Sequence, residues 1–213
     1  MTCLHVFDLD GTLLVGSATL EISRSIGAFE ETLAIEHAWA RGELGDNAFW
    51  EQCLPLWDGL TDDQIDRAFA TAPWLDGVDQ VFADIRSRAE YSVVISQSPK
   101  FFVDRIRKWG LNSAYGALVS PGNSAGAETL VSSADKLQIT NNLLVELGLA
   151  YDDCIAYGDS ASDLALFENL THTVAVNAKV RIRALASVAY DGPDFWAAYL
   201  AGRDLMDSRS APS

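Results

Sequence analysis

The chain has 213 residues, of which 49% are hydrophobic and 21% charged, so it has the composition of an ordinary globular protein. Its formal net charge of −15 argues against nucleic acid and anionic membranes as partners, because both attract basic surfaces. An anionic substrate would be repelled at long range, so local positive groups would have to hold it. The sequence does not indicate the oligomeric state.

The cysteines Cys3, Cys53 and Cys154 are odd in number and lack the spacing of metal ligands. We expect Cys3 and Cys154 to pack as small hydrophobic side chains in a reducing, cytoplasmic setting. The residues before the first predicted strand do not form a secretory signal, and no apolar run is long enough to span a bilayer.

The first predicted element is a buried strand over residues 3–7, followed by the polar run at residues 8–12. In an extended segment, Asp8 and Asp10 project to the same side. Gly11 then lets the backbone leave the strand sharply. Because neighbouring carboxylates raise each other's pKa unless a cation compensates, this run indicates a functional site.

Residues 15–74 predict a separate helical domain inserted after this strand, because their apolar residues recur near the helical period. The Gly-rich stretch 41–45 and Pro55 divide the insertion into about three or four helices. Residues 61–64 have the signature of a capping box. Four tryptophans are expected to form the core of this domain rather than a ligand cage: Trp39, Trp50, Trp57 and Trp74.

From residue 75 the pattern changes to alternating helices and strands. The predicted helices span residues 78–89, 100–110, 136–148, 162–170 and 194–206. The predicted strands span residues 91–96, 117–120, 129–132, 153–157 and 174–176. This alternation predicts an α/β core with a parallel, Rossmann-like sheet, formed by residues 1–14 and 75–206. Residues 207–213 are expected to form a disordered tail.

Ligands of such sheets bind at the carboxyl ends of the strands, and further polar residues are expected there. Ser96 follows one apolar strand, with Ser98 as an alternative, and Lys136 begins a helix. Asp159 and Asp163 follow another strand within a Gly-Asp-Ser-x-x-Asp run. Carboxylates with open positions suit Mg²⁺, and a lysine and a hydroxyl beside the metal suit a tetrahedral anion.

In order, these runs resemble the motifs of the haloacid dehalogenase (HAD) superfamily. They are Asp-x-Asp-Gly-Thr from Asp8, the serine at Ser96, the lysine at Lys136, and Gly-Asp-Ser-x-x-Asp around Asp159. The helical insertion is similar to the C1 cap of the phosphoserine-phosphatase-like branch. The resemblance implies a phosphatase that hydrolyses a small-metabolite phosphomonoester through an aspartyl-phosphate.

The resemblance also implies a role for each acidic motif residue. Asp8 would be the nucleophile, and Asp10 would protonate the leaving alkoxide and later deprotonate water. The metal, Mg²⁺, would bind the Asp8 carboxylate, the Asp10 main-chain carbonyl and the Asp159 carboxylate. Asp163 would support the metal's waters or orient Lys136.

The remaining motif residues are implied to hold the phosphoryl group. Thr12 and Ser96, with nearby backbone N–H groups, would bind its oxygens. Lys136 would offset the charge of the nucleophile and of the transferred group.

Other functions remain open to different degrees. A calcium loop does not fit, because Leu13 stands where such a loop needs glycine and Thr19 where it needs glutamate. A haloacid dehalogenase activity does not fit, since Asp10 and the metal site belong to phosphoryl chemistry. A phosphotransferase with an alcohol acceptor is compatible with the motifs. A non-catalytic phosphate-binding regulatory protein of the same fold is a further alternative.

The predicted cap departs from the phosphoserine phosphatases. The position of their acidic residue for the substrate's amino group is occupied by Ser17, with Glu21 one turn later. Those phosphatases also use an arginine of the cap. Arg41 is the candidate for that arginine here, although an ordinary surface arginine is the simpler interpretation. His37 is expected to be a solvated or core histidine. These departures argue against phosphoserine and leave open a sugar phosphate, a nucleotide-like monophosphate or another small phosphorylated metabolite.

Overall fold

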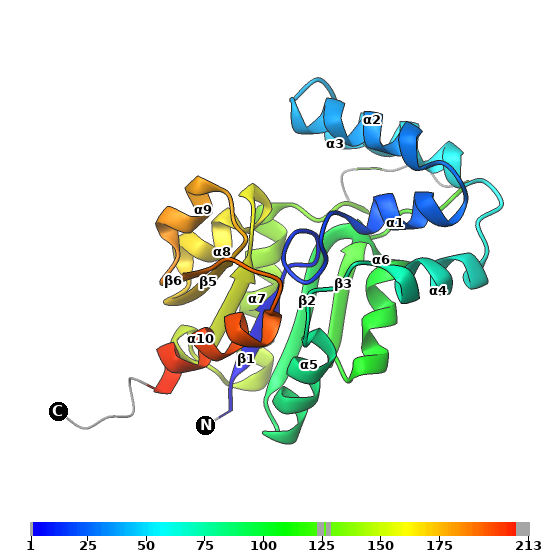
Figure 1. The fold of residues 1–213 in the computed structure, drawn as a ribbon. Coiled ribbons are helices and arrows are strands. Elements are labelled where there is room, and N and C mark those ends of the chain that lie inside the picture. Colours follow the sequence, from blue (N-terminus) through cyan, green and yellow to red (C-terminus); the bar gives the residue numbers. More distant parts are fainter. Residues whose placement is uncertain (1, 123–125, 127–128, 208–213) are drawn as a thin grey trace.

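In the computed structural model, residues 2–122, 126 and 129–207 are described, and their strands form one six-stranded parallel sheet in the order β3-β2-β1-β4-β5-β6 (Figure 1). The strands are β1 (Leu4–Phe7), β2 (Tyr91–Pro99), β3 (Ser113–Ala117), β4 (Cys154–Gly158), β5 (His172–Val176) and β6 (Val188–Tyr190). The central strand β1 pairs with β2 and β4, so the residues after all three strands meet at one edge. The predicted parallel α/β core is confirmed.

Different helices cover the two faces of the sheet. One face carries α5 (Val78–Ser87) and α10 (Phe195–Asp207), whose side chains share a hydrophobic core with Phe7. The other face is covered by α7 (Ser133–Leu147), α8 (Leu164–Asn169) and α9 (Val180–Leu185). Val6 lies in that second core, as the alternation of side chains along a strand requires.

The insertion between β1 and α5 is helical, as predicted, and its elements are α1 (Ala18–Ser25), α2 (Phe29–Ala40), α3 (Asp46–Cys53), the 3₁₀ helix η1 (Leu54–Trp57) and α4 (Asp62–Thr71). The predicted capping box is present at the start of α4, where Thr61 and Gln64 bond each other's backbone N–H groups. Figure 1 shows α2 and α3 projecting over the end of the sheet opposite the N-terminus. We call α1 to α4 the cap.

Helix α4 contacts the core through ion pairs and an aromatic contact. Arg105 pairs with Asp62 at 2.7 Å and with Asp66 at 2.9 Å. Phe69 of α4 packs against Trp109 of the core, with ring centroids 5.0 Å apart. The hairpin of α2 and α3 lies beyond these contacts, above the sheet edge.

The four tryptophans of the insertion do not all lie in the core of the cap. Trp57 is fully buried and its indole N–H donates to Ser23, so it belongs to the cap's own core. Trp74 packs instead on Trp109. Trp39 is 39% exposed, and together with Trp50 it lines a cavity between cap and sheet. The expectation of a purely structural tryptophan core was therefore wrong for Trp39.

Several predicted elements differ from the structure. Residues 129–132 are not a strand, because Ser132 forms a capping box with Asp135 that begins α7. The predicted strand 117–120 begins at the last residue of β3. The small side chains of β3 give only a weak strand pattern in the sequence. The predicted helix 100–110 is a short α6 (Lys100–Val103) followed by the 3₁₀ helix η2 (Asp104–Trp109). Helix α9 and the short edge strand β6 were not predicted.

Three further expectations concern the chain as a whole. Cys3, Cys53 and Cys154 are free and buried. Asp207 is the last residue of α10, and the rest of the predicted tail, residues 208–213, lies outside the described residues. Among the residues that the structure describes, no helix has both the length and the apolar character needed to cross a bilayer.

Candidate active site

Asp8 and Asp10 lie in a tight loop where β1 ends at the centre of the sheet. The Asp8 N–H donates to the Tyr157 carbonyl at 3.0 Å, which extends the pairing of β1 with β4 by one residue. Gly11 has a φ of +79°, and a Cβ there would lie 2.5 Å from a carboxylate oxygen of Asp159. The loop therefore needs glycine both for its backbone conformation and for its close approach to Asp159.

Lys136 connects two acidic residues from distant parts of the chain. Its Nζ lies 2.6 Å from Asp8 Oδ1, 2.7 Å from Asp163 Oδ1 and 3.2 Å from Ser162 Oγ. Burial alone would lower the pKa of Lys136, but the charges of Asp163 and Asp8 hold it above its ordinary value. The lysine is thus a fixed positive charge beside Asp8.

Asp163 uses both of its carboxylate oxygens inside the protein. Oδ1 binds Lys136, and Oδ2 accepts from the N–H groups of Asp159 at 3.1 Å and Ser160 at 3.3 Å. A Cβ at Gly158 would lie 2.5 Å from the Asp163 carboxyl carbon, so glycine is needed here as well. Asp163 therefore orients Lys136 and the loop after β4, one of the two roles expected for it.

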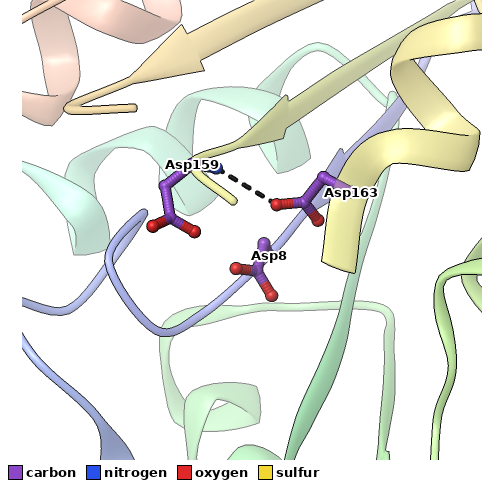
Figure 2. A group of neighbouring side chains, drawn as sticks. All are labelled: Asp8, Asp159 and Asp163. Atoms are coloured by element: carbon purple, nitrogen blue, oxygen red, sulfur yellow. Dashed lines mark hydrogen bonds between the residues drawn. The ribbon is translucent and has the colours of Figure 1, made fainter. Parts of the chain in front are cut away.

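The carboxylates of Asp8, Asp159 and Asp163 can offer oxygen atoms within 4.8 Å of one another. Figure 2 shows the three groups converging from the ends of β1 and β4 and from the segment that begins α8. The pKa of Asp159 is raised to about 6, and the pKa of Asp8 is raised well above its ordinary range. For both groups burial is the largest cause and the negative charge of Asp163 is the second. Such a cluster requires positive charge to remain ionised.

A divalent cation fits this cluster. Asp159 Oδ1 is buried and has no hydrogen-bond partner among the residues that the structure describes, so it is available as a ligand atom. Because both oxygens of Asp163 are engaged, Asp8 and Asp159 are the carboxylates left to bind a metal. An all-oxygen donor set suits Mg²⁺ or another hard cation.

Asp10 is held by two hydrogen bonds to its carboxylate. The Ala18 N–H donates to Oδ1 at 2.9 Å, and Ser98 Oγ donates to Oδ2 at 2.5 Å. Burial raises the pKa of Asp10, although these two bonds oppose the shift. A carboxyl group with a raised pKa holds its proton more readily than an ordinary aspartate, which suits it to act as an acid as well as a base.

The predicted phosphate-binding hydroxyls have different surroundings. Ser96 Oγ accepts from the Ser98 N–H at 3.0 Å, and Ser96 does not line the cavity, whereas Ser98 does. Thr12 is fully buried and its hydroxyl has no hydrogen-bond partner in the structure. Ser98 is the alternative that sequence reasoning placed second, and its contact with Asp10 depends on β2 continuing to Pro99.

A cavity of about 350 Å³ separates the cap from these residues. Asp8, Asp10 and Asp159 form its floor, and Ser17, Glu36 and Trp50 are among the cap residues that line it. The carboxyl group of Glu36, from α2, accepts a hydrogen bond from the Ser17 hydroxyl. Sequence reasoning did not single out Glu36, because its place depends on how α2 folds back over α1.

Three other residues of the insertion that the sequence suggested lie outside the cavity, unlike Ser17. His37 is exposed, as expected. Arg41 is also exposed and pairs with Glu43 at 2.6 Å. Glu21 is buried against Arg24 at 3.3 Å. All three lie outside the lining of the cavity.

The chain is similar to known hydrolases in sequence and in fold. The sequence pattern of the haloacid dehalogenase-like hydrolases matches residues 5–168. A phosphoserine phosphatase of Archaeoglobus fulgidus is 24% identical over 188 residues, and the match spans 86% of this chain but only 55% of that protein. A phosphoserine phosphatase of Methanocaldococcus jannaschii is 25% identical over 197 residues, 90% of this chain and 93% of that protein. A solved phospho-aspartyl intermediate analogue of phosphoserine phosphatase has the same fold, with a TM-score of 0.76 at 23% identity over 92% of this chain and 96% of that one.

Proposed function

Because the chain belongs to the haloacid dehalogenase-like hydrolase family, we propose that it is a Mg²⁺-dependent phosphatase that hydrolyses a small phosphomonoester through an aspartyl-phosphate on Asp8. The match confirms the predicted superfamily, and the predicted phosphatase agrees with the relatives that are phosphoserine phosphatases. The observation that best supports the proposal is the buried Asp8–Lys136–Asp163 array beside the unpartnered oxygen of Asp159.

We assign Asp8 the role of nucleophile. Its Oδ1 is held by Lys136, which leaves Oδ2 to attack phosphorus while the bond from phosphorus to the alcohol oxygen breaks. Burial and the charge of Asp163 favour protonated Asp8, so the charge of Lys136 is needed to keep it ionised. The same ammonium group stabilises the charge of the transferred phosphoryl group.

Asp10 is assigned the proton transfers. Burial favours its protonated form, which can donate the proton to the departing alkoxide. The resulting carboxylate then takes a proton from the water that attacks the aspartyl-phosphate, releasing inorganic phosphate and restoring both aspartates. The hydrogen bonds from Ala18 and Ser98 hold the Asp10 carboxyl in one orientation throughout.

The carboxylates of Asp8 and Asp159 and the main-chain carbonyl of Asp10 would hold the metal. When bound, Mg²⁺ supplies positive charge next to the phosphate and the carboxylates. Asp163 positions Lys136 rather than binding the metal. The hydroxyls of Thr12, Ser96 and Ser98 are the candidates for binding phosphoryl oxygens, and of these three residues Ser98 lines the cavity.

The proposal is tested by measuring phosphate release from a panel of small phosphomonoesters with Mg²⁺ and with a chelator. Asp8→Asn should abolish turnover, and the exposed Asp63→Asn should leave it unchanged. Metal-independent activity, or turnover by Asp8→Asn, would contradict the mechanism. Adding alcohols distinguishes the phosphotransferase alternative, because transfer yields a new phosphomonoester instead of inorganic phosphate.

A further inference from the structure

The cap side of the cavity is acidic. Glu36 and Asp46 both line it, and Trp39 donates its indole N–H to Asp46 Oδ1 at 2.8 Å. Among the described residues that line the cavity, Lys179 is the one basic side chain, and it belongs to the core. Its charge lowers the pKa of Asp159, so Lys179 acts at the phosphate end of the cavity.

Glu36 is a largely enclosed carboxyl group without a cationic partner. Within residues 2–122, 126 and 129–207, no lysine, arginine or histidine forms an ion pair with it. Burial raises the pKa of Glu36 to about 7, and the charge of Asp10 adds to the effect. A group in this state gains most from a bound cation, which would offset the cost of ionising it.

Glu36 also lies close to the reacting centre. It accepts from the hydroxyl of Ser17, and the next residue, Ala18, donates its N–H to the Asp10 carboxylate. A group held by Glu36 is therefore within reach of the alcohol oxygen that Asp10 protonates, provided the alcohol is short.

Aromatic side chains complete the cap side of the cavity. Trp39, Phe49 and Trp50 all line it, with ring centroids 5.7 Å apart for Trp39 and Phe49 and 5.0 Å for Phe49 and Trp50. The faces of such rings attract cations, and neighbouring carboxylates add to that attraction. Together these walls suit a small positive group and disfavour a negative one.

From this arrangement we propose that the substrate is the phosphomonoester of a small amino alcohol without a carboxylate, and that Glu36 binds its ammonium group. The inference rests on the proposed phosphatase function and names its substrate class. A substrate carboxylate would face Glu36 and Asp46, and no basic side chain of the cap is among the described residues that line the cavity. Arg41 is exposed and paired with Glu43. This argument disfavours phosphoserine on electrostatic grounds.

Three substrates that differ by one group each test the proposal. Phosphoethanolamine carries the ammonium group, 2-hydroxyethyl phosphate replaces it with a hydroxyl, and phosphoserine adds a carboxylate. We expect kcat/KM for phosphoethanolamine to exceed that for each of the others by about 10- to 100-fold, the range of one charge-assisted hydrogen bond. A ratio near unity, or a preference for phosphoserine, would overturn the inference.

The variant Glu36→Gln tests whether Glu36 is the residue that creates the preference for the ammonium group. It keeps the size and an acceptor for Ser17 but removes the charge, so the ratio of kcat/KM for phosphoethanolamine to that for 2-hydroxyethyl phosphate should fall to about one. Glu31→Gln, on an exposed position of the same helix, is the matched control and should retain the full preference. An unchanged preference in Glu36→Gln would contradict the assignment.

The outcomes separate this inference from the function on which it rests. Metal-dependent turnover of 2-hydroxyethyl phosphate that requires Asp8, without a preference for the amine, would refute the substrate class and leave the phosphatase intact. Absence of turnover of all three esters and of para-nitrophenyl phosphate would refute the phosphatase proposal itself.

Discussion

The ammonium group of Lys136, a side chain with no solvent exposure, lies 2.7 Å from Asp163 Oδ1. The same nitrogen lies 2.6 Å from Asp8 Oδ1, so one cation pairs with two buried carboxylates that lie far apart in the sequence. Removing the lysine would leave both acidic groups buried and uncompensated. The fold and the proposed chemistry therefore depend on the same contact.

We expect Lys136→Met to abolish phosphatase activity and to lower the free energy of unfolding by about 3–5 kcal/mol, because breaking a buried ion pair leaves an unpaired charge. Chemical denaturation and phosphate release measure the two effects. The matched control is Lys100→Met, which removes a half-exposed pair with Asp104 and should cost no more than about 1 kcal/mol. Equal losses in the two variants would show that the Lys136 pair has no special role.

The motif residues were predictable because each lies in a short run with its own chemical signature. Asp8 and Asp10 share one strand end, and Asp159 and Asp163 share one turn, so local spacing alone places each pair. That these runs meet follows from the strand order, in which β1 pairs with β4. Lys136 was predictable only as part of the ordered set, since a single lysine at a helix start is usually solvated.

The cap side of the site could not be predicted in the same way. Glu36 lies on a helix whose charged residues repeat, and only the packing of α2 above α1 turns it toward Ser17. The contact of Ser98 with Asp10 depends on β2 running past Ser96 to Pro99, whereas the apolar run that predicted this strand ends before Ser96. Edge strand β6 has three residues, too few for a periodic pattern.

The role of Asp10 predicts a dependence on the leaving group. Asp10→Asn should lower the release of an alkyl alcohol by about 100- to 10,000-fold, the usual contribution of general acid catalysis. Release of para-nitrophenolate should be far less affected in the first turnover, since that anion leaves without a proton. Because the base for the second step is also lost, stopped-flow absorbance should show a burst of para-nitrophenolate. Equal losses for both esters, without a burst, would argue against the assignment.

Metal binding should depend on pH through Asp159. The pKa of Asp159 in the metal-free protein is raised to about 6, and a metal binds the ionised carboxylate. Affinity for Mg²⁺ should therefore fall as the pH drops through 6, because protons then compete with the metal for the Asp159 carboxylate. Calorimetric titration with Mg²⁺ at several pH values measures this dependence.

A second experiment assigns the metal to that residue. Saturating Mg²⁺ should raise the melting temperature of the wild-type protein, since a ligand bound only by the folded state stabilises it. Asp159→Asn should remove this shift, whereas Asp153→Asn, outside the cluster, should retain it. A shift that survives in Asp159→Asn would place the metal elsewhere.

At the opposite end of the sheet, Glu90 is held by two partners. Arg203 of α10 donates to both of its oxygens, at 2.6 and 3.2 Å, and His5 Nε2 lies 3.0 Å from Oε2. Burial alone would raise the pKa of Glu90, but the hydrogen bonds from His5 and Arg203 overcome it and lower the pKa to about 2. The contact ties α10 to the loop before β2, far from the catalytic loop.

This pairing should stabilise the fold in a defined pH range. The pKa of Glu90 in the folded state lies below its ordinary value of 4.5, so the folded state binds fewer protons between these values, and the stabilisation is lost as the pH falls from about 4.5 to 2. Glu90→Gln should lower the free energy of unfolding by about 3 kcal/mol at neutral pH, since it leaves Arg203 without its counterion. Glu43→Gln, at an exposed pair with Arg41, should leave the free energy of unfolding nearly unchanged, because solvent screens that pair. In denaturation curves from pH 7 to 2.5, the difference between wild type and Glu90→Gln should shrink below pH 4.5, and a constant difference would mean that Glu90 acts through packing alone.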